Sequence, residues 1–170
     1  MPSTLHRTIS HSMPIADYWR VLRTSSYWTD LAAGMPTPTS VEEVDIDDGI
    51  VDVTLVHTIP EANLPSVVTK IRPGDLLITR TISWRNAVGS LDGEFTATVQ
   101  GAPASAEGTA TVHNSGEGSV EELSGKASVG IPFLGSKIEA MIVENLDELF
   151  DSEARVTDEW YTEHRSELAG

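Results

Sequence analysis

Residues 132–150 read PFLGSKIEAMIVENLDELF, and this stretch decides the fold that we predict for the chain. Its apolar side chains recur every three or four positions, which places them on one face of a helix. We expect this helix to begin near Phe133 or Gly135 and to run for about 30 residues, or about 45 Å. The apolar face comprises Leu134, Ile138, Met141, Ile142, Leu146, Leu149 and Phe150. The opposite face is predicted to be exposed and acidic, with Glu139, Glu144, Asp147, Glu148, Asp151 and Glu153.

About seven runs with the two-residue period of a strand precede this helix. An Asp-Gly pair at 48–49 separates two of them, which is a strong signal for a hairpin. Residues 15–22 and 25–32 read as short helices after the first strand, and residues 60–70 form a connector with one helical turn. The predicted strands are 4–10, 41–47, 50–58, 76–84, 91–99, 107–113 and 119–129. We therefore predict one α+β domain over residues 1–170, in which a bent antiparallel sheet wraps around the terminal helix and leaves a cavity.

The composition excludes several classes of function. The chain has 170 residues and no cysteine, so disulfides, thiolate metal sites and cysteine nucleophiles are excluded. The five histidines are scattered without metal-ligand spacing, and we predict neither a metal nor a cofactor. The 26 acidic residues outnumber the 11 basic ones, and the net charge of −15 disfavours nucleic acid and anionic membranes as partners. No secretory signal and no apolar run of about 20 residues is visible, so we expect a cytoplasmic protein without membrane insertion. The oligomeric state is left open.

The order of these elements is that of the helix-grip fold. Three segments sharpen the likeness: LLITR at 76–80 leading to Trp84, Ile131-Pro132 with GSKIE at 135–139, and Glu153 with TDEW at 157–160. With them the chain resembles an actinobacterial branch of domains of unknown function within the START-like (SRPBCC) superfamily. That superfamily includes birch-pollen-allergen-like proteins and polyketide cyclases. The resemblance covers nearly the whole chain and implies binding of lipids, polyketides or other apolar molecules.

Three polar residues stand on otherwise apolar strand faces. Arg7 alternates with Leu5 and Ile9, Arg80 lies among Ile78, Ile82 and Trp84, and His57 ends a series with Val53 and Leu55. A buried charge is costly unless it is paired. Each arginine therefore either extends to the rim or pairs with an acidic neighbour, such as Glu94 or Glu139, or it receives the anionic head of a ligand. His57 is either a hydrogen-bonded core residue or a group that orients a ligand.

Non-covalent binding of a small hydrophobic or amphipathic molecule is the leading functional hypothesis. The polar end would be oriented by Arg80, Arg7 or His57, and no catalytic residue is assigned. One alternative is an enzyme of the cyclase or dehydratase kind, with His57 and Arg80 as an acid–base pair. Another is a protein-interaction module whose core is filled. The predicted apolar walls are Val53, Leu55, Ile78, Ile82, Trp84, Phe95, Ala97, Ile138, Met141 and Ile142, while Tyr27 and Trp28 could also line the pocket.

Overall fold

The structure, a computed structural model, describes residues 3–168 and contains seven strands and four α-helices in that range. The strands are β1 (Ser3–His11), β2 (Thr39–Asp47), β3 (Ile50–Ile59), β4 (Leu76–Ala87), β5 (Ser90–Val99), β6 (Ala104–Ser115) and β7 (Gly118–Val129). The helices are α1 (Ile15–Leu22), α2 (Ser25–Ala33), α3 (Ser66–Ile71) and α4 (Gly135–Leu168), with a 3-10 turn at Glu61–Asn63. The predicted order of elements is confirmed.

The strands form one antiparallel sheet in the order β1-β7-β6-β5-β4-β3-β2. Consecutive strands from β2 to β7 are antiparallel neighbours, with α3 in the connection from β3 to β4, while β1 pairs with β7. The predicted hairpin at Asp48-Gly49 joins β2 to β3, where Gly49 has a φ of 78°, a conformation that glycine adopts without strain. This arrangement with a long terminal helix is the helix-grip fold.

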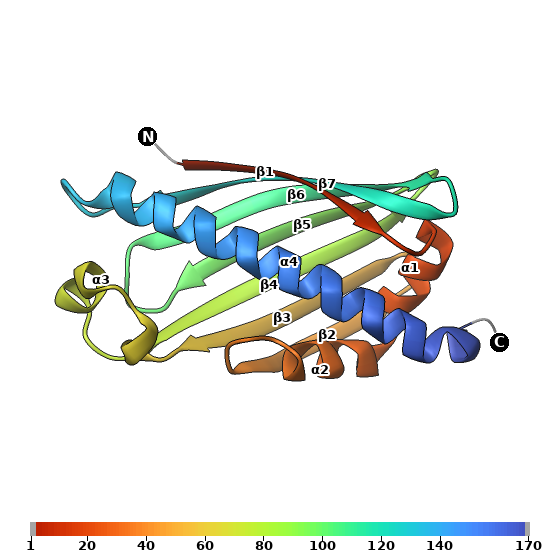
Figure 1. Cartoon of the computed structure of the whole chain (residues 1–170), viewed down its shortest axis with the longest axis horizontal. Helices are drawn as coiled ribbons and strands as arrows, with labels where there is room; N and C mark the ends of the chain where they lie inside the picture. Colours follow the sequence, from red (N-terminus) through yellow and green to blue (C-terminus); the bar gives the residue numbers. More distant parts are fainter. Residues whose placement is uncertain (1–2, 169–170) are drawn as a thin grey trace.

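Helix α4 crosses the inner face of the sheet diagonally, α1 lies at the end of the molecule near the C-terminal half of α4, and α2 lies beside β2 (Figure 1). Helix α4 packs chiefly against β1 and β7 and also contacts α1 and α2. Ile138, Leu146 and Phe150 of the predicted apolar face are buried, whereas Met141, Ile142 and Leu149 are half-buried. Within residues 3–168, no helix has the length and apolar character that crossing a membrane requires.

The prediction that Glu139 and Glu153 belong to the exposed acidic face of the helix was wrong. Glu139 is buried, and its Oε2 accepts a hydrogen bond of 2.9 Å from the backbone N–H of Val129 at the end of β7. Glu153 turns inward to Arg80. Both residues lie seven positions from the buried Leu146, a spacing that returns to nearly the same helix face.

Candidate functional site

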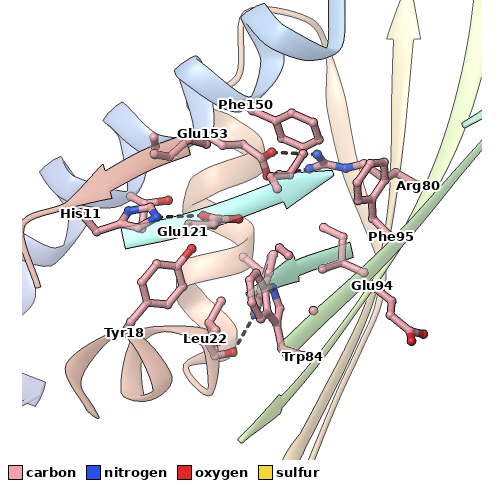
Figure 2. Close-up of a pocket in the computed structure, with 18 of the residues that line it drawn as sticks. His11, Tyr18, Leu22, Arg80, Trp84, Glu94, Phe95, Glu121, Phe150 and Glu153 are labelled. Atoms are coloured by element: carbon pink, nitrogen blue, oxygen red, sulfur yellow. Dashed lines mark hydrogen bonds and ion pairs between the residues drawn. The ribbon is translucent and has the colours of Figure 1, made fainter. Parts of the chain in front are cut away.

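A cavity of about 70 Å³ lies between the inner face of the sheet and helices α1, α2 and α4 (Figure 2). An apolar cavity needs about 150 Å³ to hold benzene, so this one has room for a few water molecules or a small chemical group. Ile82, Glu153 and Ala154 line it and are only half-buried, which places its open side between β4 and α4. A larger ligand must therefore extend through this side.

Two aromatic side chains lie flat on the sheet because glycines lie beneath them. Trp84 on β4 pairs with Gly93 on β5, and a Cβ atom at Gly93 would come within 2.9 Å of the indole ring. Phe95 on β5 pairs with Gly108 on β6, where a Cβ atom would come within 2.4 Å of the phenyl ring. Phe95 also meets Phe150 of α4 edge to face, with ring centroids 5.4 Å apart. These rings give the cavity an aromatic floor.

Arg80 and Glu153 form a bidentate ion pair that joins β4 to α4. Both terminal nitrogens of Arg80 donate to the carboxylate at 2.7 Å, and the arginine is only 2% exposed. The Nε–H of Arg80 has no acceptor among the described residues. The pairing partner predicted for this arginine was thus wrong, since Glu94 points away from the cavity (Figure 2) and Glu139 is bonded to β7.

A second buried pair lies across the cavity. Nε2 of His11 on β1 lies 2.8 Å from Oε1 of Glu121 on β7, and both side chains are buried. Tyr18 of α1 meets the His11 ring edge to face, with centroids 4.7 Å apart. Burial raises the pKa of Tyr18 well above its ordinary value, and the nearby Glu121 carboxylate adds to this shift, so the phenol remains a hydrogen-bond donor at neutral pH. The Tyr18 hydroxyl makes no hydrogen bond to the side chains drawn in Figure 2.

His57 does not line this cavity. Its Nδ1 lies 3.0 Å from the hydroxyl of Thr39 on β2, and its Nε2 has no partner within residues 3–168. Burial, reinforced by the positive charge of Arg80, lowers the pKa of His57 to about 4, so the imidazole is neutral at pH 7. The structure therefore places His57 as a hydrogen-bonded core residue and does not bring it to the cavity with Arg80.

Arg7 lies at the edge of the sheet and reaches α4. It pairs with Asp147 at 3.2 Å and with Asp151. The hydrogen bond to Asp151 is the main reason that the pKa of Arg7 is raised. The guanidinium thus joins β1 to the acidic face of the helix, and Glu94 and Glu139 were the wrong partners to predict for it.

Of the predicted site residues, Arg80, Ile82, Trp84 and Phe95 line the cavity. The others are buried elsewhere in the core (Val53, Leu55, His57, Ala97, Ile138), half-buried (Ile78, Met141, Ile142) or, like Arg7, at the sheet edge. Tyr27 and Trp28 line the cavity as well.

Four further residues line the cavity and were not predicted from the sequence: His11, Tyr18, Glu121 and Glu153. Two of these carried a signal. His11 continues the alternation of Leu5, Arg7 and Ile9, and Glu121 occupies the same strand face as Leu123. A polar residue at such a position is the pattern that singled out Arg80.

A model of the family described as "Protein of unknown function (DUF2505)" matches residues 6–161 of the chain. The chain belongs to this family. A relative from Mycobacterium tuberculosis, the uncharacterized protein Rv0481c, is 29% identical over 95% of this chain and 98% of its own length. A mycobacterial relative agrees with the resemblance to an actinobacterial branch.

Solved structures of the same fold include TTHA0849 from Thermus thermophilus, with a TM-score of 0.57, 15% identity, and coverage of 92% of this chain and 95% of that one. The di-domain ARO/CYC StfQ from the steffimycin biosynthetic pathway gives a TM-score of 0.61 at 12% identity. That match covers 98% of this chain and 52% of StfQ. At these identities the likeness establishes the helix-grip fold and nothing finer.

Proposed function

We propose that this protein binds a small amphipathic molecule non-covalently in the cavity beneath α4. The observation that carries the proposal is the combination of an aromatic floor, made by Trp84 and Phe95, with the buried Nε–H of Arg80, which has no acceptor within residues 3–168. A buried donor without a partner costs about 1–3 kcal/mol, and more when it is charged. A ligand that supplies an acceptor would recover that free energy.

The volume restricts the ligand. A lipid chain does not fit in about 70 Å³, because pockets for drug-sized ligands measure roughly 300–1,000 Å³. We infer that the polar end of the ligand enters the cavity and that its apolar part lies on the open side. Half-buried residues there, Ile82 on β4 and Ala154 on α4, would contact it, and the neighbouring Ile78 and Ile142 would extend the contact.

Native mass spectrometry and a thermal-shift screen test this function. Ala110→Leu adds volume at a buried alanine of the cavity wall, while Ala140→Leu makes the same substitution at an exposed position of α4. We expect a co-purified or screened small molecule to be retained by the wild type and by Ala140→Leu but lost from Ala110→Leu. A wild type that retains no small molecule and that no compound stabilises would contradict the proposal, as would equal retention by both variants.

A second candidate, an acid–base enzyme, is favoured by the His11–Glu121 pair beside the Tyr18 phenol. A carboxylate that orients an imidazole is a common arrangement for moving a proton. Such a site would exchange the methyl protons of acetophenone with D₂O, because a base removes a proton next to the carbonyl and returns a deuteron. Exchange by the wild type that His11→Gln abolishes supports the enzyme; exchange no faster than in buffer argues for binding alone.

A further inference from the structure

Four acidic and basic side chains inside the cavity are paired with one another. Arg80 is paired with Glu153 and His11 with Glu121, all four line the same cavity, and each pair joins two different elements of the fold. A ligand carboxylate entering this space would approach two carboxylates that already bond both terminal nitrogens of Arg80 and Nε2 of His11. A ligand ammonium group would approach the Arg80 guanidinium. Either charge would also lose its hydration on entering the cavity.

Two donors remain at the cavity, and Nδ1 of His11 also has no partner among residues 3–168. The Nε–H of Arg80, which is always protonated, has no acceptor among residues 3–168. The Tyr18 hydroxyl, on a side chain that is only 6% exposed, points toward Glu121 and the cavity without a hydrogen bond to the side chains drawn in Figure 2. Arg80 and Tyr18 therefore bring two donors, from β4 and α1, to a cavity whose acidic and basic side chains are already paired.

We propose that the ligand is an uncharged molecule whose carbonyl-type oxygen accepts hydrogen bonds from Arg80 and Tyr18 while its planar part lies on the open side of the cavity. This inference rests on the proposed binding function and names its ligand class. It reverses the sequence-based hypothesis that Arg80 receives an anionic head group, because both terminal nitrogens of Arg80 are already bonded to Glu153.

Four probes of equal size separate the alternatives. Acetophenone offers a neutral carbonyl, benzoate an anion, 1-phenylethylammonium a cation, and cumene no polar group, all on one benzene ring and with the same number of non-hydrogen atoms. Affinities are measured by NMR titration of the labelled protein, following the amide signals of residues that line the cavity. We expect acetophenone to bind at least about tenfold more tightly than each of the other three, because a hydrogen bond to a charged donor is worth at least that much.

Three variants test which side chains cause the preference for the neutral carbonyl. Tyr18→Phe should weaken acetophenone binding severalfold and leave cumene unchanged. Glu121→Gln keeps an acceptor for His11 but removes a charge from the cavity, and it should strengthen benzoate binding severalfold. Glu94 also lines the cavity, but its carboxylate points away from it, so Glu94→Gln removes the same charge outside the cavity and should change neither affinity (Figure 2).

The outcomes distinguish this inference from the proposed function. Tighter binding of benzoate, of 1-phenylethylammonium or of cumene would overturn the neutral-carbonyl ligand and leave small-molecule binding intact. An equal gain in benzoate affinity from Glu121→Gln and Glu94→Gln would also overturn it, since net charge and not the cavity would then explain the selectivity. Failure of all four probes to shift the signals of cavity residues would count against both proposals.

Discussion

Removing one partner of the Arg80–Glu153 ion pair should destabilise the protein strongly. Glu153→Leu leaves the Arg80 guanidinium, which is 2% exposed, without a counter-ion in the core. Breaking a buried pair from one side costs about 3–5 kcal/mol. We take the lower end, about 3 kcal/mol, because the Glu153 side chain is 17% exposed and water can partly replace it. For a domain of this size that loss lowers Tm by about 6–12 °C.

Two further variants complete the experiment, and unfolding is followed in urea by the fluorescence of the four tryptophans. The double variant Arg80→Met with Glu153→Leu removes both charges and should return to within about 1–2 kcal/mol of the wild type. The control is Asp151→Leu, two residues away on α4, where the carboxylate pairs with Arg7 but is 62% exposed. Exposed pairs contribute about 0–1 kcal/mol, so this variant should barely change the free energy of unfolding.

The reasoning would be refuted by a Glu153→Leu variant that loses less than about 1 kcal/mol, since an unpaired buried charge cannot be that inexpensive. It would equally fail if the double variant were less stable than Glu153→Leu alone. In that case the unpaired Arg80 would cost less than the methionine that replaces it, and the unpaired charge would not explain the loss of stability.

Two other perturbations test the surroundings of the cavity. Because the pKa of His57 falls from its ordinary 6.5 to about 4 on folding, the unfolded chain binds the proton first as the pH drops. As the pH falls from 6.5 to about 4, His57 should therefore lower the free energy of unfolding by at most about 1.4 kcal/mol per pH unit. In urea unfolding, His57→Gln should show a smaller difference in stability between pH 7 and pH 5 than the wild type. Equal differences in the two proteins would refute the lowered pKa. Gly108→Ala should lower Tm, because its Cβ would come within 2.4 Å of both the Phe95 ring and a backbone carbonyl, at a cost of about 1–3 kcal/mol. Gly130→Ala, whose Cβ would make an ordinary contact of 3.6 Å, is the matched control, and equal losses in the two variants would contradict the close packing of Phe95.

The fold could be predicted because its signals are local. The spacing of apolar residues in α4 and the alternation in each strand are properties of single segments, and the turn at Asp48-Gly49 needs only its two residues. The order of those segments then restricts the topology. The bounds of α1, α2 and most strands followed to within a few residues for the same reason.

The cavity could be predicted only in part, because it depends on pairing between distant segments. Glu121 and His11 are 110 residues apart, and their contact follows from the pairing of β1 with β7, which no local pattern fixes. Arg80 was conspicuous as a charge on an apolar face, but its partner Glu153 was assigned to the wrong side of a helix by treating all acidic residues there as exposed. Nor does the sequence fix the volume left between α4 and the sheet, which depends on how Trp84 and Phe95 settle on their glycines.

Glu139 and Glu153, the two glutamates of α4 that turn toward the sheet, also explain how the helix can be fixed and still leave an open side. Glu139 bonds the end of β7 and Glu153 bonds β4, and the two residues lie about four helical turns apart on one face. A slip of one residue would rotate the helix by about 100° and unpair both carboxylates, so these bonds set its rotation and its position along the sheet more specifically than apolar contacts do. Between them, Met141, Ile142 and Leu149 remain half-buried. Because α4 is held at Glu139 and at Glu153, the residues between them do not all need to be fully packed. The apolar part of a ligand can lie beside this stretch of the helix.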